Sequence, residues 1–462
     1  MQDKNIEMAR KIAAAVDAAG GRTYYVGGYV RDQFLGRESK DIDIEIHGIP
    51  VQRLHEILDT FGNRLAMGAS FGILGLQHYD LDIAMPRSEK EAGRGLKDFE
   101  AYVDPFIGEE NAARRRDFTM NALMQNVLTG EVLDFFGGVE DMKRRRIRHV
   151  SSRTFAEDPL RVFRSAQFAA RFGFSVAEET TEAASITDVS ALAGERILIE
   201  LEKVLLKAEK PSIFFDELRK MHQLSAWFPE AEHLIGIPQN GRFHPEGDAW
   251  THTMQVLDEA ARLRGEAAKP LWFMLSALCH DFGKAAATTV NGGAVHAYGH
   301  EKAGLPLVRS FLGRITDEVN LTAYVLNMTE LHMQPMQFVR DGARMKAYMN
   351  LFDQSVCPED LLLLVKADDM GRKGAETDVD ALAENCRETE AKLREMLAVY
   401  EERMKQPYLM GRDLIEAGLE PGPVFSEALA YAHKLRLNGI AKEDQLKQTL
   451  GWLQGRKAGK ET

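Results

Sequence analysis

The spacing of hydrophobic residues changes near residue 150 and divides the chain into two kinds of sequence. Before that point, short apolar or alternating runs closed by glycine or proline are typical of β-strands, and they fall at residues 23–28, 41–48, 72–86 and 131–138. Three other segments have the period of amphipathic helices, namely residues 1–21, 51–62 and 116–130. This mixture predicts a small α+β domain.

Strand signals nearly vanish after residue 150, and helical periodicity replaces them. It is clearest at residues 155–174, 195–208, 211–224, 249–263, 270–283 and 376–404. The Gly/Pro-rich segment 236–247 is typical of a linker. We therefore predict a fold of class α+β, a small mixed-sheet head followed by a long helical body, with regions at residues 1–145, 146–240, 241–375 and 376–462.

Composition narrows the class of protein. No apolar run reaches the 18 residues of a membrane span, and the N-terminal helix lacks the apolar core and cleavage site of a signal peptide. The cysteines, Cys279, Cys357 and Cys386, are few, odd in number and widely spaced, which argues against a disulfide framework. These features predict a cytoplasmic protein without a membrane partner.

Charge is unevenly distributed along the chain. The net charge of -12 does not by itself favour a nucleic-acid partner. Basic runs nevertheless occur at residues 114–116 and 143–148, and an acidic protein can hold a phosphate backbone in a local basic groove. The alternative is that each run is a solvated face or a cap on the junction between head and body.

Two carboxylates one residue apart suggest a metal site. In a strand, Asp41 and Asp43 point to the same side, with Ile42 and Ile44 packing behind them. Carboxylates this close repel each other unless a cation lies between them, and oxygen ligands favour Mg²⁺. Asp82, in a second predicted strand, either completes the site or is an ordinary exposed position.

A glycine pair and an arginine precede these carboxylates. Gly27 and Gly28 end a strand and allow backbone N–H groups to approach a phosphate, and Arg31 adds a positive charge. Phosphate, Mg²⁺ and carboxylates together indicate nucleotidyl transfer by metal-assisted in-line attack. The alternative is a hairpin with a solvated acidic strand.

Four further blocks follow in order. They are RRDFTMNAL (115–123), DFFGGVEDM (134–142), EDPLRVFR (157–164) and ERILIELEKVLL (195–206). With the glycine and carboxylate block, they make the chain resemble the class II bacterial tRNA nucleotidyltransferase (CCA-adding enzyme) and poly(A) polymerase family. The resemblance implies a polymerase-beta-like nucleotidyltransferase head, then a helical neck that selects the nucleotide and binds RNA.

The resemblance also implies roles for individual residues. Asp41 and Asp43 would be catalytic and hold Mg²⁺, and the nucleotide would be bound by Gly28, Arg31, Arg116, Asp117, Asp158, Arg161 and Arg164. Asp158 and Arg161, near the start of a helix, offer the acceptors and donors that can read a base edge. Many family members have arginine where this chain has Gln167, so one charged nucleotide contact is weakened or replaced.

A second set of residues lies in the helical body. It comprises His252, His280, Asp281, His300, His332 and Asp368. Imidazole and carboxylate suit a divalent transition metal, or Mg²⁺ at the carboxylate end, and such an ion can activate water for phosphate-ester hydrolysis. The pattern resembles the HD superfamily of phosphohydrolases, whose members in this family act on nucleotides and 2′,3′-cyclic phosphates. The alternative is a metal-free helical scaffold.

The resemblance implies addition and repair of the 3′-terminal CCA of tRNA from CTP and ATP, with an accessory hydrolase; no protein partner is evident. A loop predicted within residues 85–113 favours complete CCA addition. The alternatives are a poly(A) polymerase, a partial A-adding or CC-adding enzyme, and a phosphohydrolase or sensor whose head only docks RNA.

Overall fold

The computed structural model describes residues 2–39, 41–67, 73–91 and 99–458. The chain divides into two compact units, which are described separately below. Unit 1 comprises Met1–Glu200 and Ile213–Ala226, and unit 2 comprises Leu201–Ser212 and Trp227–Thr462. The fold is α+β, as predicted, whereas the boundaries of the four predicted regions stay a prediction.

Unit 1 is built on a mixed sheet of seven strands in the order β3-β4-β5-β2-β1-β8-β9. Its strands are β1 (Arg22–Val26), β2 (Asp43–His47), β3 (Arg64–Met67), β4 (Ile73–Leu76), β5 (Asp82–Ala84), β8 (Met124–Asn126) and β9 (Val132–Leu133). Only β2 and β5 pair in parallel within this sheet, and their register sets Asp43 opposite Asp82. The topology therefore brings two distant carboxylates to neighbouring strand starts.

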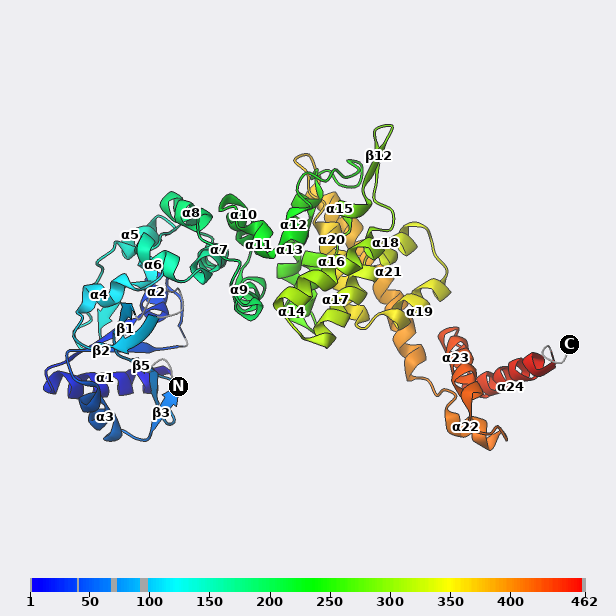
Figure 1. The fold of residues 1–462 in the computed structure, drawn as a ribbon. Coiled ribbons are helices and arrows are strands. Elements are labelled where there is room, and N and C mark those ends of the chain that lie inside the picture. The colour runs from blue at the N-terminus through cyan, green and yellow to red at the C-terminus, as the bar shows by residue number, and fades with distance from the viewer. Residues whose placement is uncertain (1, 40, 68–72, 92–98, 459–462) are drawn as a thin grey trace. The chain divides into compact units, whose positions relative to one another are not determined.

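Alternation of apolar and polar residues explains why β2 forms where it does. Ile44 and Ile46 are fully buried, and β2 pairs with β1 so that Tyr25 lies opposite Ile44. Helix α1 (Gln2–Ala18) packs against β1 and α3 (Val51–Asp59), as Figure 1 shows. The sheet is thereby held by apolar packing, and the odd-numbered side chains of β2 are left for polar contacts.

Unit 1 also contains helices and two small strand pairs outside this sheet. The other helices are α2 (Gly28–Phe34), α4 (Glu109–Arg114), α5 (Gly138–Lys143), α6 (Ser152–Glu157), α7 (Leu160–Phe172) and α8 (Glu178–Ser185). The remaining strands are the pair β6 (Arg87–Glu91) and β7 (Phe99–Val103) and the pair β10 (Arg146–Ile147) and β11 (Ser175–Val176). The middle of the predicted 85–113 loop, residues 92–98, lies outside the described residues.

Two local predictions in unit 1 are wrong. Residues 116–130 were expected to be a helix, but they form a short 3₁₀ turn (Thr119–Asn121) and then β8. Pairing of β8 with β1 between Tyr24 and Asn126 satisfies the backbone there, so tertiary contacts override the helical spacing. Asp41 was placed in a strand, but β2 begins only at Asp43.

Three helices contain the residues at which the chain passes from one unit to the other. Unit 2 is almost entirely helical. The three are α9 (Gly194–Lys207), α10 (Ser212–Lys220) and α11 (Leu224–Trp227). Unit 2 continues with α12 (Pro229–Glu232), α13 (Ala249–Leu263), α14 (Pro270–Cys279), α15 (Lys284–Ala287), β12 (Thr289–Asn291), β13 (Ala294–His296), α16 (His300–Ile315), α17 (Val319–Leu331), α18 (Met333–Arg340), α19 (Met345–Gln354), α20 (Pro358–Met370), α21 (Val379–Lys405), α22 (Gly411–Glu416), α23 (Pro423–Leu437) and α24 (Lys442–Ala458).

Residues beyond 376 begin with the predicted amphipathic helix, which is α21. The helices after it have a small core of their own, which includes Leu409, Leu414 and Leu453. Across the described residues, all three cysteines are free thiols, as predicted. No helix in the described part of the chain combines the length and apolar character needed to cross a membrane.

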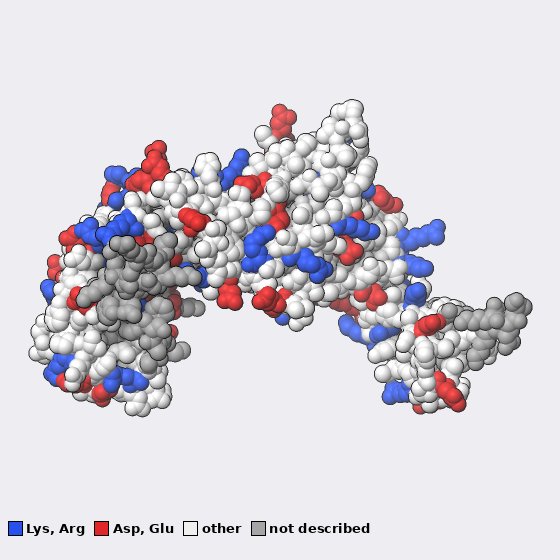
Figure 2. All heavy atoms as spheres, viewed as in Figure 1, with Lys and Arg blue, Asp and Glu red and all other residues white. Residues whose placement is uncertain are grey.

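Charged side chains of both signs are mixed over the face drawn in Figure 2. The basic run at 143–148 illustrates the local pairing behind this mixture. Arg144 contacts Glu140 at 2.8 Å, and Arg148 and Arg146 contact the buried Asp141 at 2.8 and 3.5 Å. These pairs favour the structural alternative for this run, since its arginines hold α5 and β10 together.

Segment 236–247, predicted as a linker, is an ordered loop of unit 2. Its ends are tied by hydrogen bonds from the backbone N–H of Gly236 to Asp248 and from the Gln239 side chain to the carbonyl of Asp248. Glycine and proline give this loop its turns without making it a spacer. The consequence is that its side chains are available to a site.

Candidate functional site

The first candidate site lies at the start of β2 and β5 in unit 1. Asp43 and Asp82 are register partners in the parallel pair, and Asp41 lies two residues before Asp43. Burial raises the pKa of Asp43, and the charges of Asp82 and Asp41 raise it further, against the opposing effect of Arg116. Carboxylates gathered around Asp43 in this way are a donor set suited to a divalent cation.

Gly27 allows the chain to turn beside these carboxylates. Its φ is 64°, a backbone region that favours glycine, and it precedes the first residue of α2, Gly28. A side chain added at Gly27 would lie 3.5 Å from an oxygen of Asp43 and 3.7 Å from Arg116. Because these are ordinary contact distances, it is the positive φ that favours glycine at this position.

Arg116 is fixed by a residue that the sequence analysis did not select. Glu45 lies two residues after Asp43 on β2 and is buried; it accepts a hydrogen bond from Arg116 at 2.9 Å and contacts His47 at 2.9 Å. Burial would raise the pKa of Glu45, but Arg116 and His47 lower it below its usual value. The polar residues at alternate positions of β2, Asp43, Glu45 and His47, were the sequence pattern from which Glu45 could have been identified.

Helix α7 is joined to the same segment by two arginines. Arg161 donates hydrogen bonds to the carbonyls of Arg115 and Arg116 at 2.9 and 3.4 Å, and Arg164 donates two to Asp117 at 2.8 and 2.6 Å. The structure therefore brings α7 and residues 115–117 together, as the sequence predicted for one site.

Asp158 lies just before α7 and is partly exposed. Its carboxylate accepts hydrogen bonds from the backbone N–H of Leu160 at 3.2 Å and from Arg196 at 3.1 Å. Arg161 instead bonds to carbonyl oxygens, so the predicted pair is held by separate partners. Gln167 lies on the buried side of α7 and is 1% exposed. Its position therefore differs from that expected of a charged side chain that contacts a nucleotide.

Arg31, in helix α2, is buried. Its guanidinium donates to Asp32 and to Asn121, both at 2.8 Å, and lies 4.9 Å from the ring centre of Phe172. Asn121 in turn donates to Asp117 at 2.9 Å. Arg31 thus supports Asp117 through Asn121, in addition to any contact that it makes with a nucleotide.

We expect Asp117→Asn to destabilise unit 1 by about 3 kcal/mol at pH 7, because Arg164 would keep its charge in a mostly buried place with only the more distant carboxylate of Glu200, at 3.8 Å, as a partner. Burial would raise the pKa of Asp117, but Arg164 and Asn121 lower it overall. The lost stability is therefore present above the unfolded-state pKa of about 3.9 and disappears as pH falls through the lower folded-state value.

Chemical denaturation of Asp117→Asn and wild type at pH 7 and at pH 3 measures this effect. The difference between the two proteins should shrink on acidification. Asp17→Asn, an exposed carboxylate of α1, is the control. Equal stabilities of wild type and Asp117→Asn at pH 7 would contradict the role given to the pair.

The second candidate site lies inside unit 2, where all six residues predicted as ligands meet. His252 is on α13, His280 and Asp281 follow α14, His300 begins α16, His332 follows α17 and Asp368 is on α20. All six are between 0 and 4% exposed. The helices that the hydrophobic pattern predicted therefore carry a buried polar cluster at their ends.

Asp281 connects the cluster by facing two groups of histidines. One oxygen, Oδ2, lies 3.2 Å from Nε2 of His280 and 3.6 Å from Nε2 of His252. The other, Oδ1, lies 3.2 Å from Nε2 of His300 and 3.7 Å from Nε2 of His332. Each group of three places its ligand atoms within 4.8 Å of one another, the spread expected of metal ligands.

Three of the histidines are oriented by backbone carbonyls three residues earlier in the chain. Nδ1 of His280, His300 and His332 lies 2.8, 2.8 and 2.7 Å from the carbonyl oxygen three residues earlier. Because a carbonyl only accepts, Nδ1 carries a proton, and in the neutral ring Nε2 therefore has the lone pair that can bind a cation. Both oxygens of Asp281 and Nε2 of His280 are buried without a hydrogen bond of ordinary geometry from the described residues. This donor set fits divalent cations.

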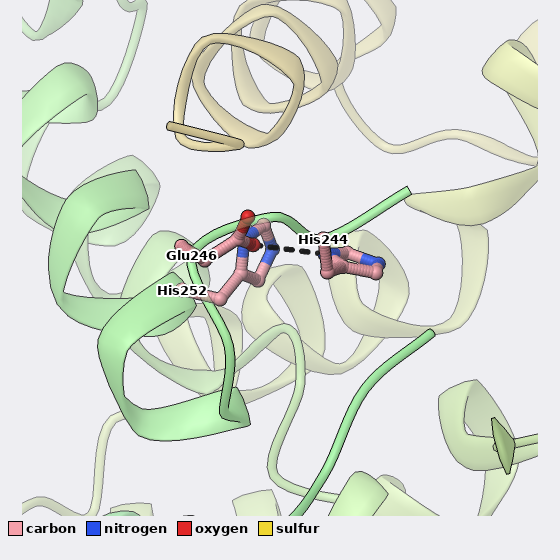
Figure 3. A group of neighbouring side chains, drawn as sticks. All are labelled: His244, Glu246 and His252. Atoms are coloured by element: carbon pink, nitrogen blue, oxygen red, sulfur yellow. Dashed lines mark hydrogen bonds and ion pairs between the residues drawn. The ribbon is translucent and has the colours of Figure 1, made fainter. Parts of the chain in front are cut away.

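His252 is oriented differently, by a carboxylate. Figure 3 shows His244, Glu246 and His252 in contact. Oε1 of Glu246 lies 2.7 Å from Nδ1 of His252 and accepts a hydrogen bond from Nδ1 of His244 at 2.9 Å. Burial would raise the pKa of Glu246, but the two histidines lower it to about 2. Nε2 of His252 then faces Asp368 at 3.0 Å.

We expect Glu246→Gln to weaken Mn²⁺ binding to unit 2 about 10- to 100-fold, the usual effect of losing a carboxylate that orients a ligating histidine. Titration calorimetry of the full chain measures it, with Glu266→Gln, an exposed glutamate of the same unit, as the control. Unchanged affinity would show that the carboxylate is dispensable for His252.

A glycine brings two parts of this cluster together. A Cβ on Gly283 would lie 2.0 Å from the carbonyl oxygen of His300 and 2.5 Å from the backbone nitrogen of Gly304. The turn after Asp281 can therefore touch α16 only with glycine at this position. The HDFGK segment thus supplies both a ligand and the close approach that places His300 beside it.

A cavity of about 570 Å³ opens onto this cluster. Asp281, His300 and Asp368 contribute to its wall, and so do residues of the 236–247 loop. Lys284 contacts Asp281 at 2.6 Å and Arg372 contacts Asp368 at 3.0 Å. The sequence analysis missed Glu246, Lys284 and Arg372, although each lies within ten residues of a predicted ligand.

Comparison with known proteins finds relatives of the head and of most of the chain. Residues 23–148 match the family model described as the Poly A polymerase head domain. The Multifunctional CCA protein of Actinobacillus pleuropneumoniae serotype 5b (strain L20) is 35% identical over 368 residues, which cover 76% of this chain and 86% of that protein.

Solved CCA-adding enzymes share the fold at lower identity. The Thermotoga maritima CCA-adding enzyme complexed with tRNA matches with a TM-score of 0.62 and 19% identity, covering 97% of this chain and 95% of that one. A CCA-adding enzyme in complex with CTP matches with a TM-score of 0.65 and 18% identity, covering 97% and 93%. Given the extent and identity of the curated match, this chain belongs to the family of multifunctional CCA proteins.

Proposed function

We propose that this protein adds and repairs the 3′-terminal CCA of tRNA, using CTP and ATP as substrates. The observation that carries the proposal is the connection between the carboxylates of β2 and β5 and helix α7, made by Arg116 through Glu45 and by Asp117 through Arg164. A relative is named as a multifunctional CCA protein, and structural neighbours are complexes with tRNA and with CTP.

The reaction joins the 3′-hydroxyl of the RNA to the α-phosphorus of the nucleotide. The O3′–P bond forms, the bond from that phosphorus to the bridging oxygen breaks, and pyrophosphate leaves. A divalent ion held by Asp41, Asp43 and Asp82 would neutralise charge on the triphosphate, and an all-oxygen donor set favours Mg²⁺. The family is metal-dependent; the choice of Mg²⁺ is part of this proposal.

Residues of α7 are proposed to choose the base. Asp158 supplies an acceptor and Arg161 a planar set of donors, so together they present both kinds of group to a Watson–Crick edge. Arg164 and Asp117 fix the helix to the segment that carries Arg116. Gly28 and Arg31 are proposed to contact the nucleotide from the turn before α2.

Incubation with three tRNAs tests the proposal. Transcripts that lack CCA, CA or A are supplied with CTP and ATP, separately and together, and product length is read on a sequencing gel. Complete addition should require both nucleotides on the transcript that lacks CCA. Failure to incorporate CTP would indicate a poly(A) or A-adding enzyme, and addition that stops after CC would indicate a partial one.

We also infer that unit 2 hydrolyses phosphate esters of nucleotides. The supporting observation is the buried cluster in which Asp281 faces two histidine pairs, so that His252, His280 and Asp368 would hold one divalent ion and His300 and His332 a second, with Asp281 shared. Such ions would lower the pKa of water and neutralise phosphate charge. Water adds to phosphorus, one P–O(ribose) bond breaks, and that oxygen takes up a proton.

A further inference from the structure

The cavity beside the ligand cluster of unit 2 has a wall made partly of aromatic residues, which the proposed hydrolysis does not use. Phe243, His296 and Tyr298 contribute to its wall. The rings of His296 and Tyr298 stack, with centroids 5.0 Å apart and planes 12° apart. Phe243 is 47% exposed and Tyr298 is 83% exposed. Such exposure leaves part of the Phe243 ring and of the Tyr298 ring accessible to a ligand, while His296 stacks on Tyr298 and Arg242 lies 5.5 Å from the centre of the Phe243 ring.

These aromatic residues come from two segments that carry none of the six predicted ligands. Phe243 belongs to the ordered loop 236–247, and His296 ends the hairpin formed by β12 and β13. In Figure 1 this hairpin projects from the helices next to α15. The helices thus provide the ligand cluster, and the two segments provide aromatic surface in the same cavity.

The polar part of the cavity has the chemistry of a phosphate site. Lys284, Arg340 and Arg372 all line it. Lys284 is 6% exposed and bonded to Gln239 of the loop as well as to Asp281. Buried cations next to the ligand cluster can bind phosphate oxygens, while exposed aromatic faces suit a planar base. A volume of about 570 Å³ lies within the range of small-ligand pockets.

We propose that Tyr298, His296 and Phe243 determine specificity in this cavity by stacking on the base of the nucleotide, while Lys284 and Arg372 contact the phosphate beside the ligand cluster. The proposal rests on the hydrolase function inferred for unit 2 and adds the residues that determine its specificity. The same chemistry is offered by a free nucleotide and by the terminal nucleotide of an RNA.

The test separates recognition of the base from the reaction. Wild type and Tyr298→Ala, loaded with Mn²⁺, are assayed on adenosine 2′,3′-cyclic phosphate and on ribose 2′,3′-cyclic phosphate, which has the same reacting group without a base. Loss of one stacking contact should raise KM for the adenosine substrate about tenfold, leaving its kcat and both constants for the ribose substrate unchanged.

Two variants serve as controls. Tyr298→Phe keeps the ring and should restore the wild-type KM. Val290→Ala changes an exposed residue of the same hairpin, 58% exposed, outside the residues that line the cavity, and it should behave as wild type. An equal rise in KM on both substrates, or no rise for Tyr298→Ala, would overturn the proposal.

Two further measurements distinguish the remaining outcomes. If wild type hydrolyses neither substrate, the hydrolase function fails, and calorimetric binding of AMP and of inorganic phosphate to the Mn²⁺-loaded protein then tests the aromatic surface alone. Tyr298→Ala should weaken AMP about tenfold and leave phosphate unchanged; equal AMP affinities would overturn the proposal. KM is also compared for the free nucleotide and for an RNA oligonucleotide that ends in a 2′,3′-cyclic phosphate. The lower KM identifies whether the ligand is a free nucleotide or an RNA end.

Discussion

Replacing Asp43 with asparagine is expected to reduce nucleotide incorporation about a thousandfold or more. The carboxylate is central among Asp41, Asp43 and Asp82, and loss of a ligand to a catalytic metal removes several kcal/mol of transition-state stabilisation. Single-turnover incorporation of CTP into a tRNA that lacks CCA measures the effect. Asp17→Asn, an exposed carboxylate in the same unit, should retain full activity.

Stability gives this prediction a second readout. Because burial and the neighbouring carboxylates raise the pKa of Asp43, its ionised form costs folding free energy at pH 7 in the absence of a metal. The asparagine variant should therefore unfold at the same temperature as wild type or at a higher one in metal-free buffer. Full incorporation by Asp43→Asn would remove the metal assignment, whereas a lower melting temperature would point to a structural role.

Replacing Asp281 with asparagine should abolish the metal binding of unit 2 and reduce its phosphate-ester hydrolysis about a thousandfold. A single carboxylate faces both histidine pairs, so its loss affects both proposed ion positions, whereas loss of His332 should affect one. Metal content by mass spectrometry after dialysis with Mn²⁺ and turnover of adenosine 2′,3′-cyclic phosphate provide the measurements.

CTP and ATP incorporation serves as the internal control for Asp281→Asn. The head carboxylates belong to unit 1, so CCA addition should stay within about twofold of wild type if unit 2 remains folded. Asp317→Asn, an exposed carboxylate of unit 2, should leave both activities intact. Retention of two ions by Asp281→Asn would contradict the shared-carboxylate arrangement.

The hydrophobic pattern predicted the fold well where the period was unambiguous. The runs around β1 and β2 and the long helices such as α13, α14 and α21 lie where the sequence placed them. The prediction failed at residues 116–130, where apolar spacing suited a helix but the segment pairs with β1. Strand pairing over about 100 residues of sequence is not visible in a local window.

The candidate site residues were also predicted only in part, because contacts that form on folding are not visible in a local window of sequence. Ligand types in a recognisable order indicated all six residues of the cluster in unit 2, and the structure brings them together. Glu45, Glu246 and Lys284 were missed, because their importance depends on which side chains they face after folding. In the sequence alone, each of these three looks like an ordinary acidic or basic residue.

The anchoring of α7 has a consequence for how substrate choice can evolve. Arg164 is committed to the mostly buried Asp117, whereas Asp158 is 39% exposed and bonded to a similarly exposed arginine. Under the role proposed for Asp158, a change at position 158 can therefore alter the hydrogen-bonding pattern offered to an incoming base without disturbing the contacts that hold α7 in place. Drift between nucleotide preferences in this scaffold should begin at position 158, with position 164 held constant by the demands of folding.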